Sequence, residues 1–375
     1  MKYLFELGHQ PHISTAEVLA VLKHAQIEYK EIENKNDFFI LDVIATEEEI
    51  EELSKKFGAI IQVGVHVESD GYPQNIIVDY LSKQETGKIN FSISPTNSKL
   101  AISIKKELKA LGKSVRYVET KNTATILHNK LIESKSHFTV FQNNVYKTIY
   151  IQDIEGFSAR DYDRPVADNV SGMLPPKLAR TMINLAEVDT EAVILDPFCG
   201  SGTVLNEALS LGFKNIIGSD ISEKAVADSE KNVAWLIEKD NLKKIKTNIF
   251  LSPSTELSGK LKPQSIDAIV AEPYMGKPLH GREPKIVLDN QTDELAKLYI
   301  NTFKTFYKIL KNEGTVIFII PKFKFGNVWL YIRCLDEIKN LGFEIENFAN
   351  GERSLLYHRP AQFVGREIWK FIKNN

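Results

Sequence analysis

Residues 195–202 read Leu-Asp-Pro-Phe-Cys-Gly-Ser-Gly, and this stretch decides the fold. It follows the short apolar run Ala192–Leu195 and precedes Val204–Leu209, which has the spacing of a helix. The pattern predicts a strand, a tight turn and a helix. Gly200 and Gly202 allow backbone torsions that other residues avoid, and the amides of the new helix point into the same space. The turn can therefore approach a ligand closely.

A carboxylate at each end of this region indicates which ligand. Asp220 ends the next apolar run, Ile216–Ser219, where a carboxylate can accept both hydroxyls of a ribose. The dinucleotide fingerprint needs a third small residue, and Leu205 occupies that place. Asp196, at the mouth of the turn, would repel phosphate and attract an amino group or a sulfonium. S-adenosylmethionine therefore fits better than NAD, although a lone Gly-x-Gly also occurs in ordinary α/β turns.

A second loop reads Ala271-Glu272-Pro273-Tyr274 and follows the apolar run Ile266–Val270. It also lies at the carboxyl end of a predicted strand, which is the edge where ligands bind in open α/β sheets. Pro273 stiffens the backbone, Tyr274 offers a face for base stacking, and the Glu272 carboxylate can accept hydrogen bonds from an exocyclic amine. We predict that these three residues are catalytic, whereas the same tripeptide alone would be a solvated turn.

Several stretches together resemble the THUMP-domain tRNA guanosine-N2-methyltransferases, over nearly the whole chain. Besides the two loops, the resemblance rests on Arg-Asp-Tyr-Asp-Arg-Pro at 160–165, Gly-Met-Leu-Pro-Pro-Lys at 172–177, Tyr-His-Arg-Pro at 357–360 and Val-Gly-Arg-Glu at 364–367. It implies methyl transfer from S-adenosylmethionine to the N2 amine of a tRNA guanosine, usually the one at position 10.

The resemblance also implies a set of cofactor-binding residues. The methionine side of the cofactor would be lined by Asp196, Phe198, Gly200 and Gly202, the ribose would be bound by Asp220, and the far wall would be formed by Met173, Leu174 and Pro175. Some relatives of this kind use a small activating protein subunit, which the sequence does not reveal.

Two departures from the family pattern stand out. The catalytic loop of the family reads Asp or Asn followed by Pro-Pro-Tyr, whereas this chain has Ala271 and Glu272 at the first two positions. Either Glu272 substitutes from a shifted register, or the amine chemistry is weakened or altered. Residues 252–254 read Ser-Pro-Ser where many members have an Asp near the adenine, so no acceptor for the adenine amine is assigned.

The composition is that of a multidomain soluble enzyme. The chain has 375 residues, of which 43% are apolar, and its formal net charge is −2. Its two cysteines exclude a disulfide framework or a cysteine-rich metal site. We find no apolar run long enough for a membrane span, and Met1–Leu7 lacks the cationic start of a signal peptide. We expect a cytoplasmic enzyme without a resident metal or membrane contact.

A basic segment predicts contact with nucleic acid despite the slightly negative net charge. Residues 99–135 contain nine Lys and Arg against three Glu, in a predicted helix at 100–111 and a strand at 115–118. The side chains that could follow a phosphate backbone are Lys105, Lys106, Lys109, Lys113 and Arg116. A charged run of this kind is usually a solvated helix face; its place in the region that the resemblance assigns to the THUMP domain favours tRNA binding.

The whole chain divides into four predicted parts. Residues 1–65 form an α+β, ferredoxin-like domain, 66–154 a THUMP-like RNA-binding domain, 155–170 a polar linker, and 171–375 a methyltransferase domain. In the last part, strand-like runs begin at Ala192, Ile216, Lys246, Ala268 and Thr315, helices alternate with them, and 362–372 resembles a final strand. This alternation predicts a doubly wound α/β, Rossmann-like sheet.

Alternatives to the tRNA methyltransferase stay open. A methyltransferase for DNA adenine or cytosine amines uses a similar pair of loops, and the Ala271-Glu272 departure leaves room for an RNA-binding protein that keeps a cofactor pocket but has little turnover. The long segment 275–284 could close over an extruded base or be a simple connector. His280 lies in it, and we rank this side chain below Glu272 as a candidate base.

Overall fold

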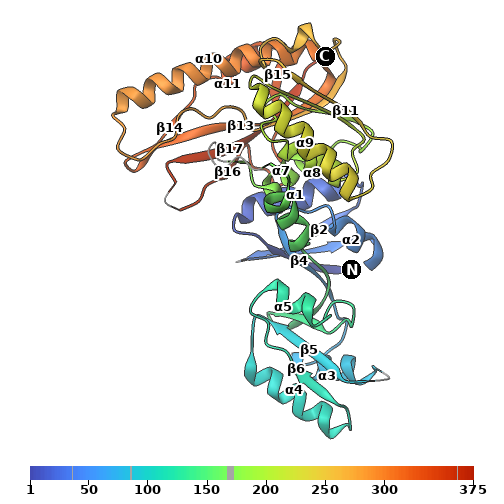
Figure 1. Cartoon of the computed structure of the whole chain (residues 1–375). Coiled ribbons are helices and arrows are strands. Elements are labelled where there is room, and N and C mark those ends of the chain that lie inside the picture. The colour runs from blue at the N-terminus through green and yellow to red at the C-terminus, as the bar shows by residue number, and fades with distance from the viewer. Residues whose placement is uncertain (36, 85–86, 167–172, 361) are drawn as a thin grey trace. The chain divides into compact units, whose positions relative to one another are not determined.

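A computed structural model describes the whole chain except residues 36, 85–86, 167–172 and 361. It divides into two compact units, many of whose helices and strands are labelled in Figure 1. Unit 1 comprises Met1–Pro11 and Ala25–Glu155, and unit 2 comprises His12–His24 and Gly156–Asn375.

Unit 1 is an α+β structure built on one eight-stranded sheet of order β2-β3-β1-β4-β8-β7-β5-β6. All neighbouring strands are antiparallel except β5, which is parallel to β6 and β7. The strands are β1 Lys2–Leu7, β2 Tyr29–Lys35, β3 Phe38–Val43, β4 Ile60–His66, β5 Ile89–Ser94, β6 Val115–Tyr117, β7 His137–Phe141 and β8 Asn144–Ile151. The helices are α2 Glu47–Ser54, α3 Pro73–Ser82, α4 Ser98–Ala110 and α5 Thr123–His128. The sheet contains strands from both sides of residue 65, and the four-part division of the chain stays a prediction.

Helix α1, Pro11–His24, lies almost entirely in unit 2 although strands of unit 1 precede and follow it in the sequence. All residues from Ile13 to Leu22 are buried, so the helix has no continuous polar face on this stretch. Its Ile13, Ala16 and Ala20 belong to the core that also contains residues of α7, Pro176–Leu185. The buried Glu17 of this helix accepts a hydrogen bond of 2.8 Å from Nδ2 of Asn184, so polar as well as apolar side chains of α1 pack within unit 2.

Unit 2 is a doubly wound α/β structure, which confirms the predicted fold of this region. Its sheet has the order β11-β10-β9-β12-β13-β17-β15, with β14 paired to β13 and β16 paired to β17. The strands are β9 Val193–Asp196, β10 Asn215–Asp220, β11 Lys246–Leu251, β12 Ile266–Ala271, β13 Leu310–Phe325, β14 Val328–Tyr331, β15 Phe343–Ile345, β16 Leu355–Tyr357 and β17 Val364–Lys373. The helical segments, besides α1, are α6 Ile154–Ser158, the π-helix η1 Ala159–Asp163, α7 Pro176–Leu185, α8 Thr203–Ser210, α9 Glu223–Lys239, the 3₁₀-helix η2 Leu257–Gly259, α10 Lys285–Ile309 and α11 Leu335–Asn340.

The order of the parallel strands fixes where ligands can bind. Strands β9 to β13 are parallel, while β17 runs antiparallel to β13. The chain moves from β9 outward to β10 and β11, then returns to β12 on the other side of β9. Strands β9 and β12 are therefore neighbours at the topological switch point, with Ile194 opposite Ala268. The loops that follow these two strands leave the same edge of the sheet side by side.

The segment 155–170 is helical as far as Asp163 and includes two buried arginines, Arg160 and Arg164. Its charged side chains are therefore partly used inside unit 2. Residues 167–170 of this segment lie outside the described residues.

Two properties of the described residues concern membrane spans and metal ions. None of the helices in this part of the chain combines the length and apolar character that a membrane span needs. The described His, Cys, Asp and Glu side chains form no cluster of three or more that could hold a metal ion.

Candidate active site

The loop after β9 requires glycine at two positions. Gly200 and Gly202 have φ angles of +50° and +84°, in the left-handed region that other residues rarely adopt. A Cβ on Gly202 would also stand 2.6 Å from Oγ of Ser229. Gly202 is the residue that precedes α8, so the glycines let the chain turn directly from the strand into the helix.

The position of Leu205, which argued against a dinucleotide site, has a structural explanation. Leu205 is fully buried on α8 and faces Gly218 of β10. A Cβ on Gly218 would lie 2.6 Å from Cδ1 of Leu205. The strand, rather than the helix, supplies the small residue that lets α8 pack closely on the sheet.

The two loops line one cavity, of about 110 Å³. The loop after β9 contributes most of the wall, and Glu272 is contributed by the loop after β12. The complete lining is Met173, Leu174, Asp196, Phe198, Cys199, Gly200, Ser201, Thr203, Val204 and Glu272. Small-molecule sites usually hold about 300–1,000 Å³. This cavity therefore matches one end of a nucleoside cofactor rather than all of it.

Buried carboxylates make this cavity attractive to a cation. Asp196 is 2% exposed, and its Oδ1 accepts a hydrogen bond of 3.0 Å from the amide of Phe198. Burial raises the pKa of Asp196 well above its usual range, and the nearby charges of Asp220 and Glu272 raise it further. A sulfonium or ammonium group in the cavity would relieve this repulsion.

Glu272 is held by an ion pair that links two parts of the sheet. Its Oε1 lies 2.5 Å from Nε of Arg366 on β17, and the two side chains are 12% and 11% exposed. Burial raises the pKa of Glu272, and the Arg366 guanidinium opposes that rise. The pair therefore helps to keep the carboxylate ionised at the cavity wall.

The rest of the second loop is fixed by a neighbouring tyrosine. Pro273 is buried, while the Tyr274 side chain is 55% exposed. The hydroxyl of Tyr299, on α10, donates a hydrogen bond of 2.8 Å to the carbonyl of Tyr274. The backbone of this loop is thus anchored while its aromatic ring remains open to solvent.

Asp220 supports the glycine loop directly. Its Oδ2 accepts from the amide of Gly200 at 3.0 Å, and its Oδ1 accepts from the amide of Ser222 at 2.9 Å. It does not line the cavity. Its predicted contact with a ribose stays a prediction, and a ribose there would lie beyond the enclosed end of the site.

The predicted far wall lies at the start of α7. Met173 and Leu174 line the cavity, whereas Pro175 precedes the helix and is not part of the lining. Arg164 donates hydrogen bonds to Oγ1 of Thr203, at 3.0 Å, and to Sδ of Met173. This arginine thus connects the glycine loop to the opposite wall.

Two arginines, Arg160 and Arg180, contact a buried carboxylate of α8, a pairing that the sequence did not predict. Glu207, fully buried in this helix, accepts from Nε of Arg160 at 2.5 Å and from Nε of Arg180 at 2.8 Å. A carboxylate in the middle of an apolar helix was the available signal, because a buried charge needs a partner. The sequence did not show which cation supplies it.

The predicted RNA-binding residues lie in unit 1, on α4 and β6 and between them. Lys106, Lys109 and Arg116 are exposed, and Lys105 is half-buried. Lys113 is also half-buried, and its Nζ donates to the carbonyl of Gln84 at 2.8 Å. At least three of the five can reach a solvent-side ligand, while one already has a protein partner.

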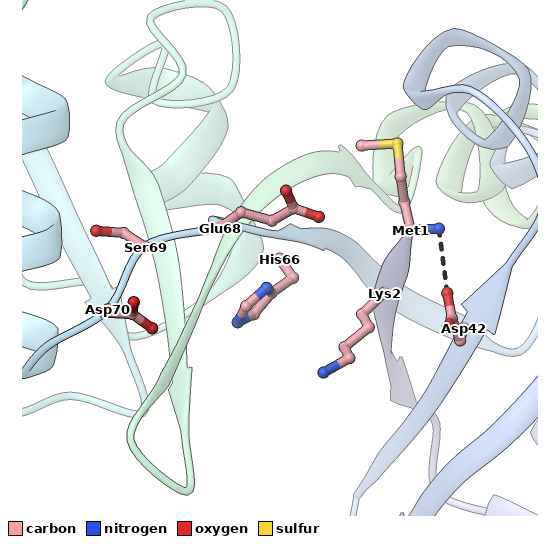
Figure 2. A pocket seen from close by; sticks show the side chains of 7 residues that line it. All are labelled: Met1, Lys2, Asp42, His66, Glu68, Ser69 and Asp70. Carbon is pink, nitrogen blue, oxygen red and sulfur yellow. Dashed lines mark ion pairs between the residues drawn. The ribbon is translucent and has the colours of Figure 1, made fainter.

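Unit 1 also has an open hollow of about 480 Å³, shown in Figure 2. It is larger than the cavity in unit 2, yet its wall carries charges of both signs and no Phe, Tyr or Trp side chain. The lining is Met1, Lys2, Asp42, His66, Glu68, Ser69 and Asp70, and the amino group of Met1 lies 3.1 Å from Asp42. Such a surface lacks the apolar faces that a nucleoside site uses, so the cavity in unit 2 is the candidate active site.

Comparisons with known proteins agree with this choice. The RMKL-like methyltransferase domain family matches residues 164–325, and a DNA methylase family matches 27–231. The tRNA (guanine(10)-N2)-dimethyltransferase of Methanocaldococcus jannaschii is 31% identical over 151 residues, covering 40% of this chain and 38% of that protein. The corresponding enzyme of Pyrococcus abyssi is 28% identical over 186 residues, covering 50% and 46%.

Solved structures show the same fold. TrmN from Thermus thermophilus superposes with a TM-score of 0.53 and 15% identity over 100% of both chains. The matched part of the sequence spans less than half the length of the two tRNA-modifying relatives. The chain belongs to the S-adenosylmethionine-dependent methyltransferases that the two family models represent, the DNA methylase model matching more than half of the chain, and it is similar to the tRNA (guanine(10)-N2)-dimethyltransferases over part of their length.

Proposed function

We propose that this protein transfers a methyl group from S-adenosylmethionine to the N2 amine of a guanosine in tRNA, at position 10. The observation that carries the proposal is that the glycine loop after β9 and Glu272 after β12 line one cavity. A donor held by the first and an amine held by the second would meet at the sheet edge. The guanine(10)-N2 relatives support the choice of base and position.

The cavity fits the charged end of the cofactor. Asp196 lies in the lining, and the left-handed glycines bring the backbone close to the ligand without a side chain in the way. When bound, S-adenosylmethionine supplies a methyl on a sulfonium, so transfer breaks that S–C bond, forms an N–C bond, leaves a thioether and makes the amine release one proton. The residues that would hold the cofactor are Asp196, Phe198, Gly200, Gly202, Met173, Leu174 and Pro175, with Asp220 at the ribose.

The second loop would prepare the amine. The lone pair of N2 is delocalised into the guanine ring, and an acceptor for its hydrogens helps to localise that pair on nitrogen. Glu272 provides a carboxylate at this place, Pro273 fixes the turn and Tyr274 offers an exposed face for stacking. The released proton can pass to Glu272 or to solvent.

The tRNA would be held in part by unit 1. Lys105, Lys106, Lys109, Lys113 and Arg116 would contact phosphates, which predicts salt-sensitive binding. A guanosine paired in a stem must leave the stack to reach the cavity, and the segment 275–284 would cover it. An enzyme that modifies tRNA would act in the cytoplasm. The proposal also includes a small activating protein subunit.

The test is methyl transfer to unmodified tRNA with labelled S-adenosylmethionine, followed by nucleoside analysis and mapping of the position. We expect N2-methylguanosine from the wild type and a loss of at least about 100-fold in Glu272→Gln. Glu294→Gln, an exposed carboxylate on α10, is the matched control and should keep full activity. Cofactor binding without transfer to any tRNA would instead indicate an RNA-binding protein that has lost turnover.

A DNA amino-methyltransferase is the second candidate. It is favoured by the DNA methylase family match and by the type II methyltransferase M.VspI of a Vibrio species, which is 34% identical over 127 residues. The same assay with double-stranded DNA separates the two. Methylated adenine or cytosine in DNA, with unmodified tRNA, would replace the tRNA proposal.

A further inference from the structure

Glu272 offers one carboxylate oxygen beyond its ion pair. The recorded contact with Arg366 engages Oε1, and among the described residues Oε2 makes no hydrogen bond. Glu272 also belongs to the lining of the cavity. An ionised carboxylate accepts hydrogen bonds and donates none, so it selects for a ligand edge with donors.

The nucleobases that carry an exocyclic amine differ at the adjacent ring nitrogen. In guanine one of the two ring nitrogens beside the N2 amine is N1–H, a donor, and the other, N3, is an acceptor. In adenine and cytosine the ring nitrogen beside the amine carries a lone pair, which is an acceptor. Beside an ionised carboxylate, guanine can donate from two neighbouring nitrogens, whereas adenine or cytosine would turn a lone pair toward the negative charge.

The ion pair with Arg366 explains why Glu272 would stay ionised and so distinguish guanine from adenine and cytosine. A protonated Glu272 could donate to a lone pair and would lose the discrimination. Arg366 opposes protonation by its charge and fixes the carboxylate by a short contact from another strand. Both side chains are nearly buried, so solvent screens the pair little.

We propose that Glu272, positioned by Arg366, reads N1–H of an extruded guanine together with its N2 amine and thereby excludes adenine and cytosine. In this arrangement Glu272 contacts the substrate and Arg366 is a positioning residue. The inference rests on the proposed function, because it specifies how the same site chooses its base.

The experiment changes the ring nitrogen and keeps the amine. Synthetic tRNAs carry guanosine, 2-aminopurine riboside or 2,6-diaminopurine riboside at the position that the wild type methylates. All three have the 2-amine, but only guanosine has N1–H. We expect the wild type to prefer guanosine by roughly 10⁴-fold in kcat/KM, as sites built around a hydrogen bond do. Equal rates on the three substrates would overturn the proposal without any variant.

The Glu272→Gln variant provides a second test, in which the protein rather than the substrate is changed. An amide can donate to a lone pair, so activity on guanosine should fall while the preference over 2-aminopurine narrows by at least about 10-fold. Glu294→Gln should keep the wild-type preference for guanosine over 2-aminopurine. Arg366→Lys should keep most of that preference. A preference unchanged by Glu272→Gln contradicts the base-reading role. Failure of the wild type to make N2-methylguanosine at all would instead overturn the proposed function, and the base-reading role with it.

Discussion

Nε of Arg366 lies 2.5 Å from Oε1 of Glu272, although strand β13 separates the strand of Arg366 from the strand that precedes Glu272. The long side chain crosses that distance at the carboxyl edge of the sheet, beside the cavity. Asp196, on the other wall, has its pKa raised in part by the Glu272 charge. The two cavity walls are thus coupled electrostatically, and Arg366 is the cation that balances one of them.

Removing the Arg366 charge should move the pH dependence of methyl transfer. Burial already raises the pKa of Glu272 and Arg366 lowers it, so Arg366→Gln raises that pKa further. Glu272 is ionised above its pKa, so the rising limb of kcat/KM in Arg366→Gln should shift to higher pH. Arg366→Lys keeps a cation at this place, so its limb should lie close to that of the wild type. Rates measured at saturating cofactor across acid to alkaline pH provide the check. The exposed Arg333→Gln is the matched control, and an unshifted limb in Arg366→Gln would exclude the ionisation role.

The sequence was enough to predict the two loops that line the cavity. It was not enough to predict the residues that hold those loops in place. Asp196 and Glu272 could be brought together because the loops after neighbouring parallel strands leave one edge, a rule that needs only the alternation of strands and helices. Arg366 could not be paired with Glu272 in this way. Its reach depends on β17 lying antiparallel beside β13, and the sequence near residue 366 does not specify that neighbour.

Local composition also gave no sign of two contacts between distant segments. The charges at 155–170 are typical of a solvated linker, yet Arg160 pairs with Glu207, which lies 47 residues away. Helix α1 belongs to unit 2 by its contacts, although the segments that precede and follow it in the sequence belong to unit 1. Both outcomes depend on contacts between distant segments, which composition does not encode.

Asp196→Asn should stabilise the cofactor-free protein while weakening cofactor binding. Burial raises the pKa of Asp196, so the folded state binds its proton more tightly than the unfolded state. The stability contributed by this group is present at low pH and is lost as pH rises through the folded-state pKa. Near neutral pH we expect the free energy of unfolding of Asp196→Asn to rise by on the order of 1 kcal/mol, which corresponds to roughly 2–4 °C in Tm. The stability of the variant should also depend less on pH than that of the wild type.

Fluorescence can follow this change in unit 2 alone, because the three tryptophans of the chain, Trp235, Trp329 and Trp369, all lie in that unit. Titration calorimetry gives the cofactor affinity. Asp293→Asn, at an exposed carboxylate on α10, should change neither quantity. A lower Tm with unchanged affinity would contradict the assignment of Asp196 to the cofactor.

Gly202→Ala should damage the cofactor loop in two ways. The left-handed torsion disfavours an L side chain by about 1–2 kcal/mol, and the new Cβ would meet Oγ of Ser229 at 2.6 Å. We expect both lower stability of unit 2 and weaker cofactor binding. Gly259→Ala is the control, because nothing lies within 4 Å of its added Cβ.

A double variant separates the two causes. Ser229→Ala in the Gly202→Ala background removes the close oxygen but leaves the torsion, so it should recover only part of the loss. Full recovery would show that the torsion is tolerated there, and wild-type cofactor affinity in the single variant would remove Gly202 from the cofactor site.

Glu207→Gln should strongly destabilise unit 2. The carboxylate accepts from Arg160 and Arg180, and both guanidinium groups also lie over the ring of Phe157, at 4.9 and 4.8 Å from its centroid. Neutralising the fully buried acid removes the charge that both nearly buried guanidinium groups contact, and breaking a buried ion pair costs about 3–5 kcal/mol. Because α8 begins at the glycine loop, cofactor affinity should fall as well. Urea unfolding followed by tryptophan fluorescence measures the first effect, with the exposed Glu238→Gln as control. A loss below about 1 kcal/mol, the range of surface changes, would mean that packing around Phe157 rather than charge holds this helix in place.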